Sequence, residues 1–252
     1  MTNDKLIVAL DVDSIRRARQ LISELREHVA MFKVGSQLFT AAGPEIVREI
    51  LRSGSRVFLD LKFHDIPNTV AAAGVEATRL GVSIFNIHAA GGVEMMERTA
   101  DAVSRVAESE GLSRPAVIAV TVLTSADATT LEATGVAADP KSHVLRLAAL
   151  AAKSGMDGVV ASPLEVTPIR AAVARPGFLI VTPGVRPGGT SHDDQKRVMS
   201  PAEAIRAGAD YLVVGRPVSE ADDPVAAAKA ITAEIESAAK SQAAHEEGTA
   251  GR

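Results

Sequence analysis

The chain has 252 residues, a formal net charge of −4, 46% hydrophobic residues and 23% charged residues, which is the balance of a soluble globular protein with a sizeable core. The mild acidity and the lack of a basic segment interleaved with aromatics argue against nucleic-acid binding, and the absence of Cys excludes disulfides, thiolate metal sites and cysteine nucleophiles. No apolar run approaches the roughly 20 residues that span a bilayer, and the N-terminal segment lacks the pattern of a signal peptide, so we expect a cytoplasmic protein without a membrane partner.

Short apolar stretches alternate with longer amphipathic segments along the whole chain. Strands are predicted at residues 6–10, 31–35, 56–60, 83–88, 116–121, 158–161, 178–182 and 211–215. Helices are predicted at residues 14–27, 44–52, 67–80, 93–110, 143–153, 164–173, 201–207 and 224–239. Several helices have Pro in the first turn or Gly just past the end, as is usual at these positions.

Eight strands, each followed by a helix, are the count of a closed parallel barrel. The rival is an open doubly wound sheet, which would place a Gly-rich turn after the first strand, whereas this sequence reads LDVDS there. We therefore predict the α/β class with a single (β/α)8 TIM barrel as the catalytic domain over residues 1–240. The polar residues 241–252 are predicted to form a disordered tail.

Charged residues gather where the first three strands end, which is the end of this fold that carries active sites. In the segment DLKFHDIPNT, Asp60 and Lys62 are two residues apart and share one face of a strand, and Asp65 follows in the next loop. A lysine between carboxylates is expected to stay protonated in a poorly solvated cup. An isolated pair of this kind would be read as a structural salt bridge, but Asp11 and Lys33 at neighbouring strand ends favour a catalytic cluster.

The loops after the seventh and eighth strands often bind phosphate in this fold. Arg216 offers a bidentate donor to phosphate oxygens, and Gly215 beside it allows a ligand to approach the backbone closely. Arg186 and Gln195 lie in the long, Gly-rich loop after the seventh strand. Long loops in compact domains are often binding loops or lids, so we expect a phosphate site here.

The remaining polar residues at strand ends allow two interpretations. Thr121, Thr124 and Ser125 after the fifth strand could contact a planar polar ring or simply cap a helix, and spacing does not separate these. His64 and His88 are interpreted as structural. No spacing typical of a metal site, a phosphate-binding P-loop or a serine hydrolase occurs, so neither a metal nor a cofactor is predicted.

With these residues in place, the chain resembles the orotidine 5′-phosphate decarboxylase family over about residues 5 to 235. The segments that carry the resemblance are, in the family's order, VALDVD, FKVG, DLKFHDIPNTV, TPGVRP and VVGRPV. The resemblance implies a cofactor-free lyase that converts orotidine 5′-monophosphate to uridine 5′-monophosphate, the last step of de novo pyrimidine biosynthesis. It also implies a homodimer in which each active site is shared across the interface.

The resemblance further implies a role for each residue. Lys62 would be the catalytic lysine, in a charged network completed by Lys33, Asp60 and Asp65. The implied substrate contacts are Asp11 and Lys33 on the ribose, Thr124 on the pyrimidine, Arg186, Gln195, Gly215 and Arg216 on the phosphate, and Asp65 and Thr69 reaching into the partner's site.

Two alternatives remain open on the sequence. A related barrel decarboxylase of the 3-keto-gulonate 6-phosphate type shares a D-x-K-x-x-D segment, but by resemblance it holds a metal near the second strand, where Lys33 would repel a dication. A non-catalytic phosphate-binding barrel would need the phosphate loops but not the network of Asp and Lys. That network therefore argues for the enzyme.

Overall fold

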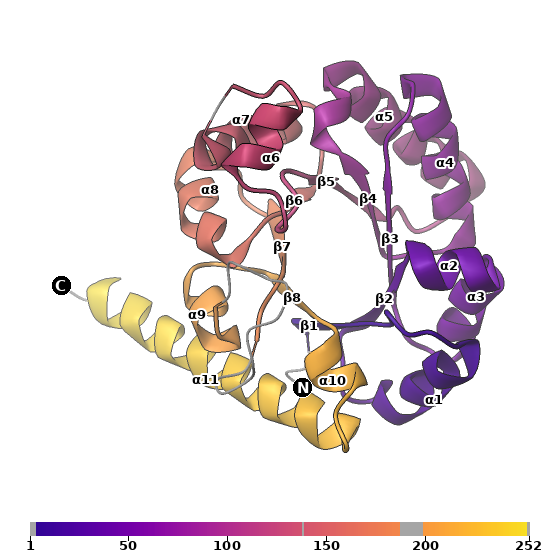
Figure 1. Ribbon diagram of the computed structural model, residues 1–252, viewed down its shortest axis with the longest axis vertical. Helices are drawn as coiled ribbons and strands as arrows, with labels where there is room; N and C mark the ends of the chain where they lie inside the picture. Colours follow the sequence, from indigo (N-terminus) through magenta and orange to yellow (C-terminus); the bar gives the residue numbers. More distant parts are fainter. Residues whose placement is uncertain (1–3, 138, 187–198, 251–252) are drawn as a thin grey trace.

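Eight parallel strands form a closed barrel in the computed structural model, which describes residues 4–137, 139–186 and 199–250. The strands follow one another around the barrel in chain order, and β8 pairs with β1, so the sheet has no free edge. Figure 1 shows this ring of strands surrounded by the helices. The strands are β1 (Leu6–Ala9), β2 (Met31–Gly35), β3 (Val57–Phe63), β4 (Ile84–His88), β5 (Ala116–Val120), β6 (Gly158–Val160), β7 (Leu179–Pro183) and β8 (Tyr211–Val214). The predicted (β/α)8 barrel is confirmed.

Helices connect the strands on the outside of the barrel. They are α1 (Ile15–Leu25), α2 (Ser36–Ala42), α3 (Glu45–Arg52), α4 (Pro67–Leu80), α5 (Val93–Glu110), α6 (Ala128–Ala133), α7 (Pro140–Lys153), α8 (Val166–Ala172), α9 (Pro201–Arg206), α10 (Arg216–Ser219) and α11 (Pro224–Ala250). Two short 3₁₀ turns, η1 (Ala89–Gly91) and η2 (Pro163–Glu165), follow β4 and β6. A Pro in the first turn and a side-chain cap start two of these helices: Asp139 caps α7, which begins at Pro140, and Ser200 caps α9, which begins at Pro201.

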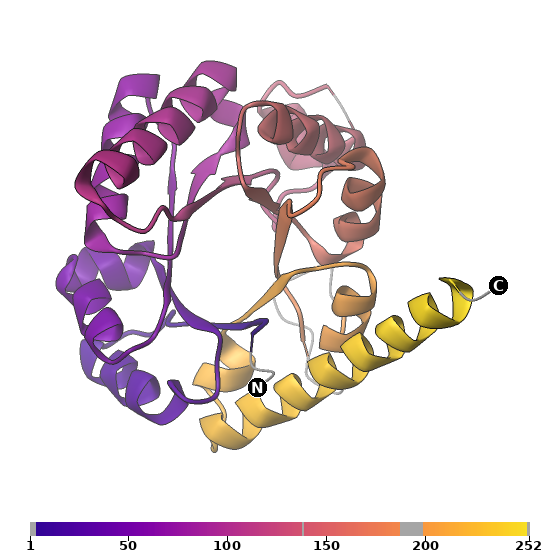
Figure 2. The same ribbon diagram turned by 180° about the vertical axis from the view of Figure 1, so that it is seen from behind.

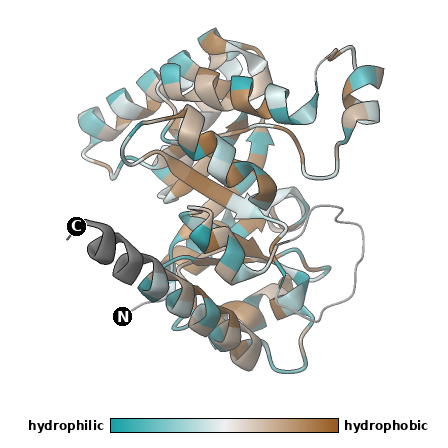
Figure 3. Ribbon diagram, turned by 90° about the vertical axis from the view of Figure 1, so that its left-hand side faces the viewer, coloured by the Kyte–Doolittle hydropathy of each residue, from teal (hydrophilic) through white to brown (hydrophobic). Residues whose placement is uncertain are grey.

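The alternation of side chains along each strand divides the buried residues into two groups. One group includes Leu6 and Val8 and packs against the helices, forming the larger core. The other group, which includes Ile7 and Phe58, comes from strands alone and fills the inside of the barrel. Figure 3 shows a mainly brown strand at the centre of the view and helices that alternate between brown and teal, as expected for helices with one buried face. The barrel interior is therefore a packed apolar floor beneath the polar residues at the strand ends.

The observed elements differ from the predicted ones mainly at element boundaries and in the shortest helices. Strand β3 continues to Phe63, beyond the predicted end at residue 60, and α7 begins at Pro140 instead of residue 143. The short helices α2, α6 and α10 were not predicted, because four to seven residues carry too little periodicity to be recognised.

Helix α11 is longer than predicted. It runs past residue 239 to Ala250, so the tail over residues 241–252, predicted to be disordered, is helical as far as Ala250. This stretch is rich in Ala and Glu, which favour helix. The first part of α11 packs along α9, α1 and α10, and Figure 2 shows its end projecting from the barrel. No helix in the described part of the chain combines the length and the apolarity that a membrane crossing requires.

Candidate active site

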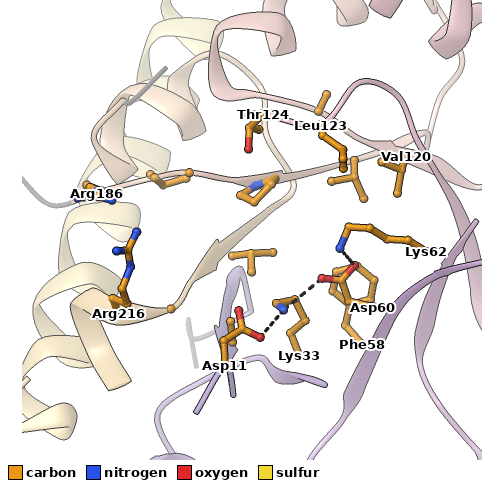
Figure 4. Close-up of a pocket in the computed structure, with 18 of the residues that line it drawn as sticks. Asp11, Lys33, Phe58, Asp60, Lys62, Val120, Leu123, Thr124, Arg186 and Arg216 are labelled. Carbon is orange, nitrogen blue, oxygen red and sulfur yellow. Dashed lines mark hydrogen bonds and ion pairs between the residues drawn. The ribbon is translucent and has the colours of Figure 1, made fainter. Parts of the chain in front are cut away.

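A cavity of ≈ 450 Å³ opens at the carboxyl ends of the barrel strands, which is large enough for a small molecule. Its polar and charged lining comes from six different strand ends and loops, and consists of Asp11, Lys33, Asp60, Lys62, Thr124, Arg186, Arg216 and Glu220. Its apolar wall is formed by Phe58, Val120, Val160, Pro183 and Val213 with their neighbours. Figure 4 shows the labelled members of this set pointing into one space. Polar residues from distant segments of the chain therefore meet at this end of the barrel.

Four charged side chains along one wall form a continuous chain of alternating sign (Figure 4). The Lys33 ammonium lies 2.9 Å from Asp11 Oδ1 and 3.1 Å from Asp60 Oδ2. The other carboxylate oxygen of Asp60, Oδ1, lies 2.6 Å from Lys62 Nζ. Asp60 therefore bridges two lysines, and Lys33 bridges two aspartates.

Burial and charge act in opposite directions on the two central members of this cluster. Burial alone would raise the pKa of Asp60, but the ammonium groups of Lys33 and Lys62 and the hydrogen bonds to its oxygens outweigh it, so this pKa lies below its ordinary value. Burial alone would lower the pKa of Lys33, but Asp60 and Asp11 outweigh it, so this pKa is raised. Both groups are therefore charged at neutral pH, although the residues are only 8% and 7% exposed.

The backbone of β3 changes conformation at Lys62. Its φ angle is 53°, and it is the one non-glycine residue with positive φ in the described ranges. The pairing of β3 with β4 shifts register between Leu59 and Phe63, as at a β-bulge. A non-glycine residue in this region costs about 1–3 kcal/mol, and such strain gathers at functional sites. Asp60 and Lys62 share the inner face as predicted, but through this irregularity and not through a regular strand.

Asn86 on β4 is a member of this cluster that the sequence interpretation missed. It is 0% exposed, and its side chain contacts both Asp60 and the backbone of Lys62. A signal was present, because Asn86 is the one polar side chain inside the apolar run Ile84–Ile87, and it lies two residues from Ile84 on the inner face. A buried polar residue in such a position needs hydrogen-bond partners.

Gly35 ends β2 beside the same cluster. A Cβ atom at this position would lie 3.0 Å from Asp11 Oδ1 and 3.1 Å from Lys33 Nζ. Both distances are shorter than ordinary van der Waals contact, so any larger residue would push against the pair of charges. The Gly of the FKVG segment therefore leaves room for the Asp11–Lys33 ion pair.

The other wall of the cavity carries the cations predicted to bind phosphate. Arg186 and Arg216 lie across the cavity from Lys62 in Figure 4, and Gly215 lines the cavity between β8 and α10. A Cβ atom on Gly215 would be 3.6 Å from Ala9, an ordinary contact, so the protein itself leaves space for a side chain there. Gln195 lies outside the described residues.

The structure separates the hydroxyl residues that follow β5. Thr124 lines the cavity, whereas Thr121 is buried and donates its hydroxyl to the Val160 carbonyl at 3.0 Å. Ser125 is exposed and does not line the cavity. Thr121 therefore caps no helix but ties β5 to β6, and the N-cap of the following helix α6 is Asp127. A ligand contact of Thr124 stays a prediction.

Two predicted residues do not line this chain's own cavity. Asp65 and Thr69 are both exposed, and Asp65 Oδ1 accepts a hydrogen bond from the Ile66 amide at 2.6 Å. Ile66 between them is 67% exposed. Their role in a partner's site stays a prediction.

The two histidines lie beside the cluster with ring centroids 5.4 Å apart. Burial, helped by the nearby His64 and Lys62, lowers the pKa of His88, so His88 is neutral at pH 7. Neither ring lines the cavity. Within the described residues, no group of three or more His, Cys, Asp or Glu side chains is arranged to hold a metal ion.

Comparisons with known proteins agree on one family. The sequence model of the "Orotidine 5'-phosphate decarboxylase / HUMPS family" matches residues 4–231. The chain is 56% identical over 231 residues to orotidine 5′-phosphate decarboxylase of Pelobacter propionicus, covering 92% of this chain and 95% of that one. It is 55% identical over 232 residues to the protein of the same name from Geobacter sulfurreducens, with coverages of 92% and 96%. The crystal structure of orotidine 5′-phosphate decarboxylase from Lactobacillus acidophilus superposes with a TM-score of 0.81 at 37% identity, covering 92% of this chain and 99% of that one.

Proposed function

The chain belongs to the orotidine 5′-phosphate decarboxylase / HUMPS family, and we propose that it performs this decarboxylation at the cavity described above. It converts orotidine 5′-monophosphate to uridine 5′-monophosphate and CO₂, a step of pyrimidine biosynthesis. Neither of the two alternatives is favoured, since the similar proteins carry the decarboxylase name. We propose the cytoplasm as its location.

The reaction needs a group that stabilises negative charge at one carbon atom. Loss of CO₂ from C6 of the pyrimidine ring leaves an electron pair on a carbon with no adjacent carbonyl to delocalise it. A fixed ammonium group within a water-poor cavity stabilises such a charge far better than water does. The observation that carries the proposal is the Lys62 ammonium, held 2.6 Å from Asp60 at the wall of the cavity.

Lys62 has two tasks in this mechanism. As CO₂ leaves, its positive charge lies beside the carbanion at C6, and it then donates a proton to C6 as the general acid. The C6–CO₂ bond breaks, a C6–H bond forms, and Lys62 is reprotonated from solvent after product release. Asp60 orients the ammonium group, because it is buried, ionised and bonded to Lys62 Nζ.

The rest of the nucleotide supplies the binding energy. Asp11 and Lys33 hold the ribose hydroxyls at one side, while Arg186, Gly215, Arg216 and Gln195 bind the phosphate. Contacts remote from C6 can lower the chemical barrier, because they fix the ring against Lys62 and exclude water. Thr124 contacts the pyrimidine between these two regions.

A second copy of the chain completes each site. Asp65 and Thr69 are exposed and are not among the residues that line their own cavity, and the exposed Ile66 offers an apolar surface beside them. We propose a homodimer in which Asp65 extends the charged network of the partner and Thr69 contacts the partner's substrate.

The direct test is spectrophotometric turnover of orotidine 5′-monophosphate by native protein and Lys62→Ala. Loss of an interaction made only in the transition state lowers kcat, and the fall should reach several orders of magnitude. Lys229→Ala on the exposed face of α11 is the matched control and should be unchanged. Turnover near the native rate by Lys62→Ala would refute the proposed role.

Mixing two inactive variants tests the shared site. Lys62→Ala and Asp65→Ala should regain partial activity when combined, because a heterodimer then holds one site with both native residues. Subunit exchange is verified with differently tagged chains. Exchange without recovered activity would exclude Asp65 from acting in the partner's site.

A further inference from the structure

Asn86 lies at the centre of the charged cluster without reaching the cavity. It is on β4, completely buried, and absent from the residues that line the cavity. The inner-face residue two positions earlier, Ile84, belongs to the apolar filling of the barrel. On β4, Asn86 is therefore the first inner-face residue above the apolar interior of the barrel, and it lies beneath the cavity.

Both ends of the Asn86 carboxamide are used. Its Nδ2 donates to Asp60 Oδ1 at 2.6 Å, and its Oδ1 accepts from the backbone amide of Lys62 at 2.8 Å. The orientation of the carboxamide is dictated by its partners, because an ionised carboxylate only accepts and a backbone N–H only donates. One planar group thus fixes the distance between the Asp60 carboxylate and the Lys62 backbone.

The contact with Lys62 replaces a bond that the sheet does not supply. The ladder between β3 and β4 is interrupted between Leu59 and Phe63, which is where Lys62 adopts its φ of 53°. A buried backbone N–H without a partner is costly. The side chain of Asn86 satisfies it and so stabilises the conformation that turns Lys62 toward the cavity.

The contact with Asp60 affects the ammonium group of the same lysine, because Asp60 is its ion-pair partner. Asp60 Oδ1 is also the oxygen that binds Lys62 Nζ at 2.6 Å. A donor from Asn86 favours the ionised form of Asp60 and limits where this oxygen can move. Asn86 therefore controls both the backbone and the charge partner of Lys62.

We propose that Asn86 is a positioning residue for the decarboxylation, which sets the place of the Lys62 ammonium and of the Asp60 carboxylate without touching the substrate. This inference rests on the proposed roles of Lys62 and Asp60. Because Asn86 acts through groups that work on the reacting carbon, its loss lowers kcat and leaves KM close to native.

Asn86→Ala tests whether the loss of Asn86 lowers kcat and leaves KM close to native. Removing a hydrogen bond to a charged group should lower kcat on the order of 10- to 100-fold, with KM and the Kd of uridine 5′-monophosphate nearly unchanged. Ile84→Ala, on the same strand and the same inner face, is the matched control for a hole in the barrel. It should reduce thermal stability but not kcat, measured where circular dichroism shows both variants folded.

Asn86→Asp gives a readout that a merely structural role would not produce. When protonated, the new carboxyl group can donate to Asp60 and accept from the Lys62 amide, which restores both bonds. When ionised it cannot donate, and it repels Asp60. The kcat of Asn86→Asp should therefore be highest at acid pH and fall as pH rises, over a range in which the native kcat and the circular dichroism spectra stay constant.

Two results would overturn the inference. One is a kcat for Asn86→Ala equal to that of Ile84→Ala, and the other is a pH profile of Asn86→Asp parallel to the native one. If Asn86→Ala does not fold, Asn86→Asp, with nearly the native shape, decides alone. Lys62→Ala is measured in parallel: if it is inactive while the Asn86 variants resemble native protein, only the role of Asn86 fails, whereas an active Lys62→Ala removes the proposed mechanism itself.

Discussion

Replacing Asp60 by Asn removes one charge from the centre of the cluster and keeps the side chain's size. Lys33 and Lys62 would then lose the carboxylate that lies 3.1 Å and 2.6 Å from their ammonium groups. At an effective dielectric constant of about 20, pairs at these distances attract by roughly 5 and 6 kcal/mol before desolvation is counted. Desolvation offsets most of this attraction, so the measured change is smaller.

The structure narrows the expected magnitude. Removing one partner of a buried ion pair costs about 3–5 kcal/mol. Lys33 keeps a second carboxylate, Asp11, at 2.9 Å, and the side chain of Lys62 is 36% exposed and can be solvated. We therefore expect Asp60→Asn to lower the free energy of unfolding by about 2–4 kcal/mol at pH 7.

The assay is urea-induced unfolding of native and variant protein at one fixed protein concentration, from pH 7 to pH 3. The pKa of Asp60 is lowered in the folded protein, so its contribution is complete above the unfolded-state pKa of about 3.9 and is lost as pH falls through the lower folded-state pKa. The difference between the two proteins should be constant from pH 7 to about 5 and shrink only below about 4.

An exposed ion pair provides the control. Glu49 lies 2.7 Å from Arg19, but these side chains are 26% and 60% exposed, so Glu49→Gln should cost no more than about 1 kcal/mol. The reasoning is refuted if Asp60→Asn is no less stable than Glu49→Gln, or if the difference from native protein already disappears between pH 7 and pH 5.

Three further results are expected from steady-state kinetics with orotidine 5′-monophosphate. Gly35→Ala should raise KM, because its new Cβ would press on the Asp11–Lys33 pair at 3.0 and 3.1 Å, while Ser36→Ala on the exposed next residue should not. Arg216→Ala should raise KM on the order of 10- to 100-fold through lost charge-assisted hydrogen bonds to phosphate, while Arg206→Ala, exposed on α9, should not. Dialysis against a chelator should leave kcat and KM unchanged.

Each of these three predictions can be contradicted by a specific result. A native KM in Gly35→Ala would mean that the ion pair tolerates displacement or does not bind substrate. Unchanged KM and kcat/KM in Arg216→Ala would remove Arg216 from the phosphate site. Activity lost to the chelator and restored by a divalent cation would favour metal-dependent chemistry of the sugar-phosphate type.

The order of elements and the end of the barrel that carries the site could be predicted from the sequence. Both depend on local information: short apolar runs mark the buried strands, a period of 3.6 residues marks the helices, and eight strand–helix repeats are the count of a closed barrel. Asp11 and Lys62 follow a predicted strand, Asp60 ends one and Lys33 lies within one, and parallel strands bring their carboxyl ends together. Their common location therefore followed from chain order alone.

The contacts that these residues make with one another depend on the tertiary structure. Periodicity tells which face of a strand a residue occupies, but not how far neighbouring strands are shifted or where a ladder breaks. The positive φ of Lys62 and the double contact of Asn86 arise from the register of β3 against β4, and the separate fates of Thr121 and Thr124 arise from how β5 meets β6. The sequence alone therefore predicted that the charged residues lie at the carboxyl ends of the strands. Which carboxylate oxygen contacts which ammonium group depends on how the strands pack, because most of these contacts join residues far apart in the chain.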